Sequence, residues 1–469
     1  MKVFILNLPN KVPIIRRFKC SYNAPLFLLP PLELAYLAGV TKNNDKVEYV
    51  FRDYMLNGSN RKDVISDINM YAPELIVTIV GIESVDDDLL KIKEIREKVD
   101  SKVLIMGYLP SIYPGEFLKM SFIDFILMNE PEETYSELLE HLSNESNQEY
   151  KMIKGLAYRA NGETIVNPWR ERIEDLDSIP IPDRESLKKN NYSEPYFGKP
   201  FTTMLYSRGC PFTCNYCVRT YGHKVVYHSS SRMIKELKEV IAKQKIKYVR
   251  FMDDTFTINK NKVLELCNEI IKEKLNFNWA CLSRPDTIDD EIAIKMKEAG
   301  CQRVYLGIES GSQKVLDYYK KGCRIEDIIK AANILNKCHI EIFGFLMTGA
   351  INETDDDFKK SLDMIKSIKV DFAVLDLLMP YPGTDLFNEM EDEIEFSLNP
   401  YILRFKDTKQ YAVMKKREVL FYKSFYCNIH QIMKQFYYFL EYPKDSAKGS
   451  YAMLRHFIGN EGKQHEKYI

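Results

Sequence analysis

Three cysteines stand close together near the middle of the sequence, in the run Ser-Arg-Gly-Cys-Pro-Phe-Thr-Cys-Asn-Tyr-Cys that ends at Cys217. The spacing Cys210-x3-Cys214-x2-Cys217 lets each thiolate bind one iron of a cubane cluster, and it leaves the fourth iron without a cysteine ligand. A further molecule can coordinate that open iron. A structural zinc site instead needs four ligands, and His223 or His228 would supply the fourth. The spacing alone therefore does not decide between an iron-sulfur cluster and a structural zinc ion.

The other seven cysteines are scattered along apolar stretches, at positions 20, 267, 281, 301, 323, 338 and 427. The start of the chain, Lys2 to Leu6, has the pattern of a buried strand rather than of a signal peptide. No apolar run approaches the roughly 20 residues of a membrane span. Ten cysteines without an export signal indicate a reducing compartment. The sequence therefore predicts a cytoplasmic protein with no transmembrane segment.

The composition excludes several classes of protein. The length of 469 residues predicts two or three domains, and the 45% hydrophobic and 28% charged residues are typical of a globular protein. Lys and Arg total 66 against 67 Asp and Glu, which gives a net charge of -1. Because no overall basic field is present, we expect no nucleic-acid partner.

The elements that position these residues begin with a predicted α/β domain over residues 1-145. Short apolar runs alternate there with helical periods, which is typical of a doubly wound parallel sheet covered on both faces. The runs are 3-6, 47-51, 75-80, 103-106 and 125-127, with a helix over 32-41. Such sheets bind ligands at the carboxyl ends of their strands. The residues at or just past those ends are Asn7, Asp53, Gly81, Gly107 and Glu130.

A second α/β domain is predicted over residues 201-390. Six apolar runs with intervening helices, at 201-206, 248-252, 277-282, 303-308, 340-347 and 374-379, fit a (β/α)6 partial TIM barrel. Residues 146-200 are interpreted as a linker with a hairpin around Asn161-Gly162. Residues 391-469 are predicted to form a mainly helical, aromatic-rich extension.

The cysteine motif, with the aromatic Tyr216 before its last cysteine, resembles the signature of the radical S-adenosylmethionine (SAM) superfamily. Four further runs at successive predicted strand ends agree with it: 250-256, 283-286, 307-311 and 344-354. The resemblance covers about residues 201-384. It implies that Cys210, Cys214 and Cys217 hold a [4Fe-4S] cluster, that SAM binds its open iron, and that cleavage of SAM yields a 5'-deoxyadenosyl radical.

The resemblance also implies which residues contact SAM. They are Tyr216, Asp253, Asp254, Ser283, Arg284, Glu309 and Gly349. Arg284 would pair with the SAM carboxylate, and Glu309 would accept hydrogen bonds from the ribose. For both residues a salt bridge at the rim of the barrel is the alternative. The Asp253-Asp254 pair also resembles an acid/base or metal dyad.

The N-terminal domain resembles the cobalamin-binding domains that precede some radical SAM barrels. The run from Asp53 through Met55 to Gly58 keeps the spacing of their Asp-x-His-x-x-Gly motif, with Met in place of the histidine that ligates cobalt. The runs 30-37 and 124-132 also resemble the corresponding segments of proteins in which a cobalamin-binding domain precedes a radical SAM barrel. This resemblance therefore spans about residues 1-383. Members commonly lack the histidine. The implied cobalamin contacts are Asn7, Asp53, Met55, Gly58, Gly81, Gly107 and Glu130.

Two features leave an alternative open for this domain. Glycines usual in the family are absent from Met106-Gly107-Tyr108 and from the run 129-132, where the backbone would approach the cofactor. A domain that kept its fold and lost cobalamin has the same sequence pattern. Asp53 also has an alternative role as a helix cap.

The resemblance predicts a radical SAM enzyme that methylates an unactivated carbon with the help of cobalamin. A radical cyclisation, oxidation or rearrangement, with or without cobalamin, is the alternative, and a non-enzymatic iron-sulfur or cobalamin sensor is a third. The absence of a second Cys-x2-Cys cluster disfavours methylthiolation.

The expected partners are a small-molecule or lipid-like substrate and an electron donor such as flavodoxin or ferredoxin. The aromatic runs 421-426 and 436-439 would line a lipid pocket, lie at a membrane surface or pack on a core.

Overall fold

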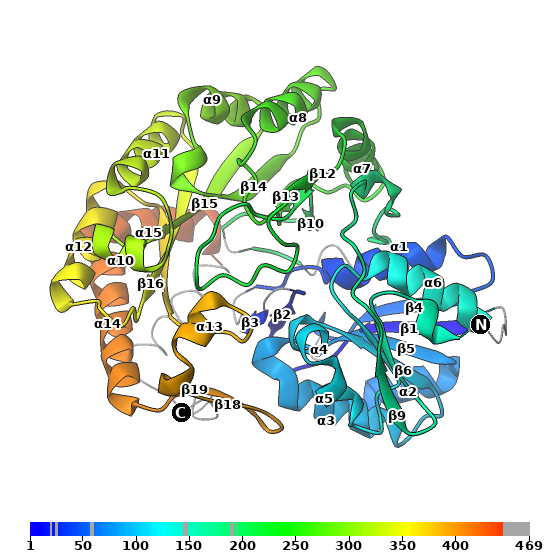
Figure 1. The fold of residues 1–469 in the computed structure, drawn as a ribbon. Coiled ribbons are helices and arrows are strands. Elements are labelled where there is room, and N and C mark those ends of the chain that lie inside the picture. Colours follow the sequence, from blue (N-terminus) through cyan, green and yellow to red (C-terminus); the bar gives the residue numbers. More distant parts are fainter. Residues whose placement is uncertain are drawn as a thin grey trace. The chain divides into compact units, whose positions relative to one another are not determined.

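The computed structural model describes residues 1-18, 21-23, 27-56, 61-143, 149-187, 192-194 and 196-443. Gly58, Cys20 and the end of the predicted C-terminal extension lie outside these residues. The chain divides into two compact units (Figure 1). Unit 1 comprises Met1–Glu194 with Leu398–Tyr401, and unit 2 comprises Pro195–Ser397 with Ile402–Ile469. In the described part of the chain, no helix has the length and apolar character needed to cross a membrane.

Unit 1 is built on a seven-stranded sheet in the order β4-β1-β5-β6-β7-β8-β9. The first five of these strands are parallel, and the last two add antiparallel to the edge. The strands are β1 (Lys2–Asn7), β4 (Glu48–Asp53), β5 (Leu75–Ile79), β6 (Lys102–Met106), β7 (Phe125–Leu127), β8 (Leu156–Ala160) and β9 (Glu163–Val166). β5 is buried at all five residues, as expected of a strand covered on both faces. The strand order reverses at β1, between β4 and β5.

The helices of unit 1 connect these strands. They are α1 (Leu32–Lys42), α2 (Arg61–Tyr71), α3 (Val85–Arg96), α4 (Tyr108–Ile112), α5 (Pro114–Leu118) and α6 (Glu132–Ser143). A short hairpin of β2 (Ile14–Arg16) and β3 (Ser21–Asn23) follows β1. The predicted parallel strands and the helix over 32-41 are present.

Unit 1 extends further along the chain than the predicted boundary at residue 145. The hairpin predicted around Asn161-Gly162 is β8-β9, and it pairs with β7 instead of lying in a separate linker. The segment after the hairpin is also fixed to unit 1, because Asp183 donates its backbone N–H to the carbonyl of Ala35 at 2.8 Å. Gly39 allows this approach, since a Cβ there would lie 2.3 Å from the carbonyl oxygen of Ile181.

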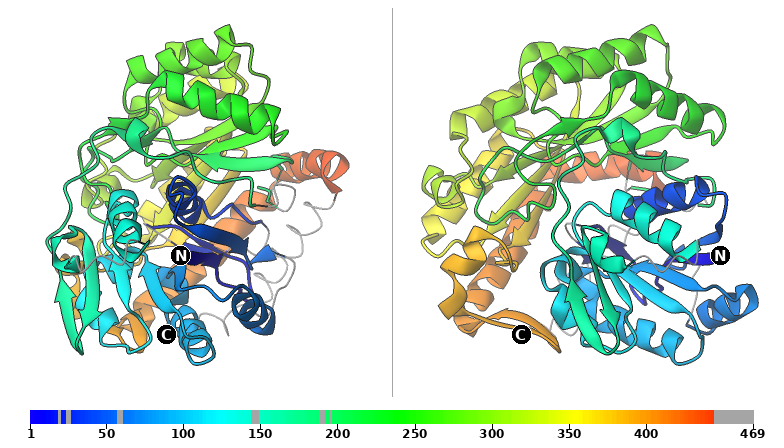
Figure 2. Two further views of the ribbon diagram at one scale, coloured as in Figure 1. Left: turned by 90° about the vertical axis from the view of Figure 1, so that its right-hand side faces the viewer. Right: turned by 45° about the vertical axis from the view of Figure 1, so that its right-hand side comes forward.

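Unit 2 contains a six-stranded parallel sheet in the order β10-β13-β14-β15-β16-β17. The strands are β10 (Phe201–Met204), β13 (Tyr248–Phe251), β14 (Asn278–Ser283), β15 (Cys301–Glu309), β16 (Glu341–Thr348) and β17 (Phe372–Leu377). The helices after successive strands are α7 (Ser230–Ala242), α8 (Lys260–Lys272), α9 (Asp290–Glu298), α10 (Gln313–Tyr318), α11 (Ile325–Lys337) and α12 (Asp355–Ser367). Figures 1 and 2 show α7, α8, α9, α11 and α12 along the outer side of this sheet.

The helices of unit 2 begin where the sequence supplies a cap. Ser229, Asn259, Asp289 and Thr354 each accept a backbone N–H in the first turn of the following helix, which satisfies a donor that has no partner within the helix. Each of these helices turns an apolar face toward the sheet. The resulting core is centred on the fully buried Trp279.

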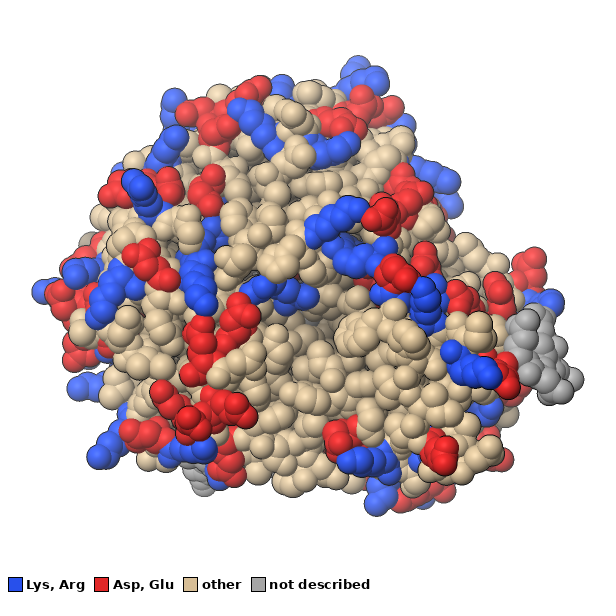
Figure 3. Space-filling view, in the orientation of Figure 1, with Lys and Arg blue, Asp and Glu red and all other residues tan. Residues whose placement is uncertain are grey.

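The C-terminal part of the chain contains α13 (Asp385–Glu389), a two-stranded sheet of β18 (Ile394–Leu398) and β19 (Tyr401–Phe405), and two helices, α14 (Thr408–Tyr426) and α15 (Ile429–Glu441). On α14, the aromatic side chains of Phe421 and Phe425 are buried in the core, so the packing interpretation holds for this helix. On α15, several apolar side chains remain exposed, including Phe436 at 64%. Charged side chains of both signs are interspersed over the face shown in Figure 3.

Candidate functional site

The cysteine loop of unit 2 directly follows β10. It is closed at its base by a two-residue antiparallel pair, β11 (Ser207–Arg208) with β12 (Val226–Tyr227). Gly209 starts the loop at a φ of 101°, a left-handed conformation that favours glycine. The N–H of Cys210 then donates to the carbonyl of Gly222 at 3.1 Å, and the N–H of Cys217 donates to the carbonyl of Cys214 at 3.3 Å. These bonds fix the backbone that carries the three thiols.

All three cysteines of the loop carry thiol groups that are not joined in disulfides. Cys214 is buried, whereas Cys210 and Cys217 are half-buried. Burial raises the pKa of the Cys210 thiol. Among the described residues, no three His, Cys, Asp or Glu side chains converge on one metal ion. A cubane cluster does not require such convergence, because each cysteine binds a different iron.

Arg284 reaches the cysteine loop from the end of β14. Its guanidinium Nη1 lies 3.5 Å from the Sγ of Cys214, and its Cζ lies 3.5 Å from the centroid of the Phe212 ring. The same guanidinium forms a two-pronged ion pair with Asp286 at 3.0 and 2.9 Å. The predicted pairing of Arg284 with a SAM carboxylate therefore competes with Asp286. The observed contacts place positive charge beside Cys214.

Asp253, at the end of β13, is fully buried. Its carboxylate accepts hydrogen bonds from the N–H of Tyr206 at 3.1 Å, from the hydroxyl of Ser207 at 2.6 Å and from the N–H of Ser207. Burial raises the pKa of Asp253 to about 6, against the lowering effect of these bonds. The carboxylate thus holds the junction of β10 and β11 at the start of the loop, and its contact with SAM stays a prediction. The neighbouring Asp254 accepts the N–H of Gly209 at 3.3 Å.

Glu309, at the end of β15, lies in a buried ion pair with Lys321 at 2.8 Å. Burial, and then the negative charge of Glu309, raise the pKa of Tyr216 in the cysteine loop well above its ordinary value. Lys321 was not among the predicted site residues, because a single lysine between helices carries no pattern that distinguishes it from a surface residue. Tyr216 connects this pair to the cysteine loop.

Two other predicted SAM contacts lie at neighbouring strand ends. Ser283 is buried, and its hydroxyl forms a hydrogen bond with the hydroxyl of Thr257. Gly349 has a φ of 120°, and its N–H donates to Glu353 at 2.8 Å. Glu353 is held in turn by Arg417 of α14 at 2.9 Å. The Glu353–Arg417 pair was missed because its two residues stand 64 positions apart.

A buried polar network joins the strand ends of unit 1. Asn7 donates to Asp53 at 2.9 Å and accepts from Arg16 at 2.9 Å. Arg16 forms a two-pronged ion pair with Asp88 at 2.9 and 2.7 Å, and Asp88 accepts the N–H of Gly81 at 3.1 Å. The structure thus links three predicted residues, Asn7, Asp53 and Gly81, at the point where the strand order reverses. Arg16 and Asp88 were not predicted, since both lie outside the apolar runs.

Asp53 makes three hydrogen bonds, accepting from Asn7, from the N–H of Met55 at 3.0 Å and from the hydroxyl of Tyr192 at 2.9 Å. Burial raises its pKa. Met55, two residues after Asp53, is buried, with 8% of its surface exposed. The bond from the N–H of Met55 closes a local turn after β4, so Asp53 holds this turn as well as its place in the network, and its role as a helix cap stays a prediction.

Gly107 and Glu130 lie further along the same sheet. At Gly107 a Cβ would lie 2.3 Å from the carbonyl oxygen of Val80, so glycine there is required by the packing of the chain itself. Glu130 is buried and accepts the N–H of Ile173 at 3.0 Å. This bond ties the end of β7 to the segment after the hairpin.

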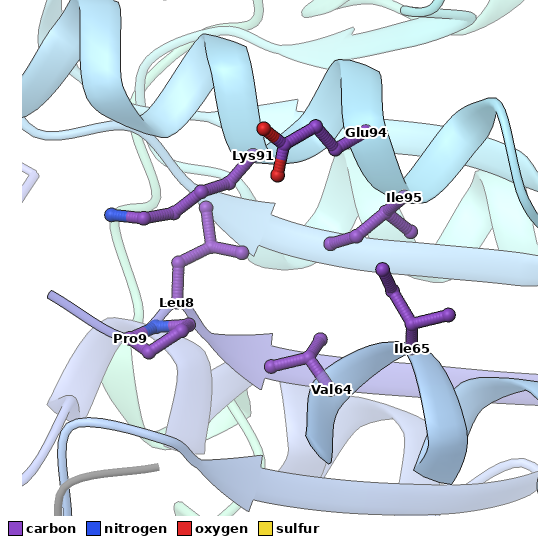
Figure 4. Close-up of a pocket in the computed structure, with 7 residues that line it drawn as sticks. All are labelled: Leu8, Pro9, Val64, Ile65, Lys91, Glu94 and Ile95. Carbon is purple, nitrogen blue, oxygen red and sulfur yellow. The ribbon is translucent and has the colours of Figure 1, made fainter. Parts of the chain in front are cut away.

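Unit 1 also has a small, mostly apolar pocket beyond the end of β1. Figure 4 shows Val64, Ile65 and Ile95 around it, while the ammonium group of Lys91 points away from its apolar centre. Lys91 pairs with the carboxylate of Asp87. None of the predicted cobalamin contacts lines this pocket.

Comparison with known proteins gives the following matches. Residues 204–365 match the radical SAM superfamily. An uncharacterized methyltransferase of Pyrococcus horikoshii is 32% identical over 363 residues, which cover 76% of this chain and 78% of that protein. The anaerobic magnesium-protoporphyrin IX monomethyl ester cyclase of Rubrivivax gelatinosus is 26% identical, with 90% of this chain and 77% of the cyclase covered.

Two solved structures have a similar fold. The radical SAM methyltransferase TsrM from Kitasatospora setae, solved with cobalamin and a [4Fe-4S] cluster, matches with a TM-score of 0.68 at 17% identity over 83% of this chain and 74% of that chain. The cobalamin-dependent radical SAM enzyme OxsB, solved with aqua-cobalamin, matches with a TM-score of 0.72 at 17% identity over 99% of this chain and 76% of that chain. The chain belongs to the radical SAM superfamily, whose cofactors are a [4Fe-4S] cluster and SAM, and it has the fold of the cobalamin-dependent members.

Proposed function

We propose that this protein is a cobalamin-dependent radical SAM methylase that transfers a methyl group to an unactivated carbon of a small-molecule substrate. The observation that carries the proposal is the loop after β10 that places three cysteine thiols together, with the Arg284 guanidinium beside Cys214. The six-stranded sheet of unit 2 is then a (β/α)6 partial barrel. The sheet of unit 1 is the cobalamin-binding domain.

In this proposal Cys210, Cys214 and Cys217 hold the cluster. When bound, the cluster with SAM supplies a 5'-deoxyadenosyl radical, and cobalamin supplies the methyl group. A flavodoxin- or ferredoxin-type donor provides the electron. Arg284 borders the cluster ligands, with its guanidinium Nη1 3.5 Å from the Sγ of Cys214.

The buried Glu309–Lys321 pair is the best candidate for orienting SAM. The pair provides a carboxylate that accepts hydrogen bonds and an ammonium group that donates them. Tyr216 belongs to the cysteine loop, and the charge of Glu309 contributes to its raised pKa, so the pair acts close to the loop that would hold the cluster. Asp253 and Asp254 hold the first residues of the same loop.

The residues of unit 1 fit cobalamin as a polar cradle without a histidine at the Met55 position. Asn7, Asp53 and Gly81 meet at the reversal of strand order, where parallel sheets bind ligands. The hydrogen bonds of the network hold these side chains in place before any ligand arrives. This preorganisation lowers the cost of binding.

A radical ring closure or oxidation is the second candidate function. The observation that favours it is the match to the Rubrivivax cyclase over 90% of this chain. Both candidates require SAM cleavage, and they differ in the fate of the methyl group of SAM.

The discriminating experiment is anaerobic purification with cobalamin, followed by a spectrum and by an assay with SAM labelled in its methyl group. Methylase activity predicts bound cobalamin and labelled product. A protein that cleaves SAM without retaining cobalamin would contradict the methylase and favour the second candidate.

The SAM-orienting role is tested by a matched pair of lysine variants. Lys321→Ala should retain the iron content of the wild type and weaken SAM binding, because a charge-assisted hydrogen bond contributes about 1.5 to 3 kcal/mol. Lys320→Ala removes the adjacent lysine, which is exposed and paired with Glu389, and should leave SAM affinity unchanged. Equal SAM affinity in both variants would reject the role of Lys321.

A further inference from the structure

One face of the six-stranded sheet in unit 2 carries aromatic side chains that the core does not use. We name it the aromatic face and define it by Tyr305, Phe343, Phe345 and Met347. The ring centroids of Tyr305 and Phe343 are 5.1 Å apart, those of Tyr305 and Phe345 are 5.9 Å apart, and those of Phe343 and Phe345 are 5.5 Å apart. These rings therefore form one continuous surface on β15 and β16.

The aromatic face is opposite the helix-packed core. Side chains alternate between the two faces of a strand, and on β16 the residues Ile342 and Leu346 belong to the core and are fully buried. Phe343, Phe345 and Met347 are only half-buried. Tyr305 is only 2% exposed, so the apolar surface that this face offers to a ligand is that of Phe343, Phe345 and Met347.

Paired strands extend this surface sideways. Leu282 of β14 is half-buried and pairs in register with Tyr305, and the half-buried Val374 of β17 pairs with Phe345. At the usual spacing of about 4.8 Å between strands, four strands span roughly 14 Å. From Phe343 to Met347 the face runs roughly 13 Å along β16. The surface is thus broad in both directions.

The lower end of the aromatic face is closed and carries positive charge. Arg303 pairs with Glu341 at 2.9 Å, and the hydroxyl of Tyr438 donates to the same carboxylate at 2.7 Å. Arg250 lies in the same row of paired residues, with its guanidinium carbon 3.9 Å from the centroid of the Tyr305 ring. Arg303 is 1% exposed and Arg250 is 5% exposed, so this row of engaged side chains closes the lower end of the face.

The upper end of the aromatic face adjoins the candidate SAM site. Gly307 pairs in register with Phe345, and a Cβ on Gly307 would lie 2.8 Å both from the Oε1 of Glu309 and from the Nζ of Lys321. The Glu309–Lys321 pair therefore occupies the space beside Phe345. A ligand on the face lies next to the groups that reach Tyr216 and the cysteine loop.

We propose that the aromatic face binds the substrate, and that this substrate carries a broad, planar, conjugated ring system. The proposal rests on the proposed function for the claim that a radical formed at the cysteine loop acts on the bound molecule. Offset contacts between flat rings contribute beyond apolar burial, and the polarisable thioether of Met347 favours aromatic partners. A flexible saturated chain would gain only the free energy of apolar burial, without the contribution of ring contacts.

The test compares two probes that share a carbon skeleton and carboxylates but differ in planarity. Protoporphyrin IX is flat and conjugated, whereas protoporphyrinogen IX has saturated bridges and is not flat. Binding of each to the anaerobically reconstituted holoenzyme is measured by ultrafiltration and quantified after reoxidation. We expect protoporphyrin IX to bind at least about tenfold more tightly, with palmitate unable to displace it.

Three variants locate the binding surface. Phe345→Leu keeps an apolar side chain without a ring, and we expect it to weaken protoporphyrin binding by roughly 2- to 12-fold. Phe345→Tyr keeps the ring and should bind like the wild type. Phe436→Leu makes the same change on the exposed surface of α15 and should have no effect. Iron content and thermal unfolding are measured for each variant to show that it is folded.

Each remaining outcome overturns the proposal. Equal affinity for the two probes, no binding of either, displacement by palmitate, or loss of binding in Phe436→Leu but not in Phe345→Leu would all contradict it. Formation of 5'-deoxyadenosine from SAM is measured separately on the wild type. If SAM is cleaved while the probes show no difference, the substrate proposal fails and the proposed function stands. If the planar probe binds selectively but SAM is not cleaved, the proposed function fails instead.

Discussion

Substitution of the buried Asp253 by Asn should change how stability depends on pH. The carboxylate is fully buried and accepts three hydrogen bonds from Tyr206 and Ser207, yet burial raises its pKa from 3.8 to about 6. The folded protein therefore binds this proton more tightly than the unfolded chain does. The corresponding stability is fully present below pH 3.8 and is lost as the pH rises through about 6.

The size of the effect follows from the two pKa values of Asp253. They differ by about 2.2, which corresponds to about 3 kcal/mol at about 1.36 kcal/mol per pKa unit. About 1.3 kcal/mol of this loss falls between pH 5 and pH 7. An asparagine does not titrate, so Asp253→Asn removes this part of the pH dependence.

The assay is urea unfolding of the cluster-free chain at pH 5, 6 and 7. From pH 5 to pH 7, the wild type should lose about 1.3 kcal/mol more unfolding free energy than Asp253→Asn, since all other titrating groups are common to both proteins. Asp363→Asn, an exposed position on α12, should follow the wild type. Parallel pH curves for the wild type and Asp253→Asn, or a difference of opposite sign, would refute the reasoning.

Three further predictions address the other elements of the site. Cys217→Ala should abolish iron loading because one iron loses its protein ligand, whereas Cys338→Ala should retain the iron content of the wild type; equal iron in both would exclude the assigned ligands. Arg417→Ala should lower the unfolding free energy by about 3 to 5 kcal/mol because it leaves the carboxylate of Glu353 buried without its charge partner, and a urea midpoint equal to that of the wild type would contradict this. Cobalamin bound beside Met55 should show no nitrogen splitting in the electron paramagnetic resonance spectrum of its cob(II) form, and a nitrogen-split spectrum would reject a ligand-free lower face.

The sequence predicted the parts of the fold that depend on local pattern. Continuous apolar runs such as Leu75 to Val80 indicate buried parallel strands, and they appear within one or two residues of their predicted bounds. The strand at 374-379 is shifted to Phe372–Leu377, because the run Leu378 to Pro380 continues the apolar pattern past the last ladder bond. The cysteine motif is likewise local, so its position at a strand end was predictable.

Contacts between distant residues were not predictable in the same way. Asp253 was expected at SAM because it ends a strand, and the sequence does not show that Ser207 would occupy its carboxylate. Lys321 and Arg417 acquire their roles only when the fold brings them to Glu309 and Glu353. The hairpin at 156-166 was recognised from its turn, but its pairing with β7 depends on an exposed sheet edge that no local pattern encodes.

The central claim is that the loop of Cys210, Cys214 and Cys217 supports radical cleavage of SAM. The most direct measurement is the formation of 5'-deoxyadenosine from SAM by the anaerobically reconstituted protein with a low-potential reductant, compared with Cys214→Ala prepared in the same way. We predict 5'-deoxyadenosine from the wild type and none above background from the variant. A wild type that loads iron and binds SAM but forms no 5'-deoxyadenosine, or a variant that forms as much as the wild type, would contradict the account.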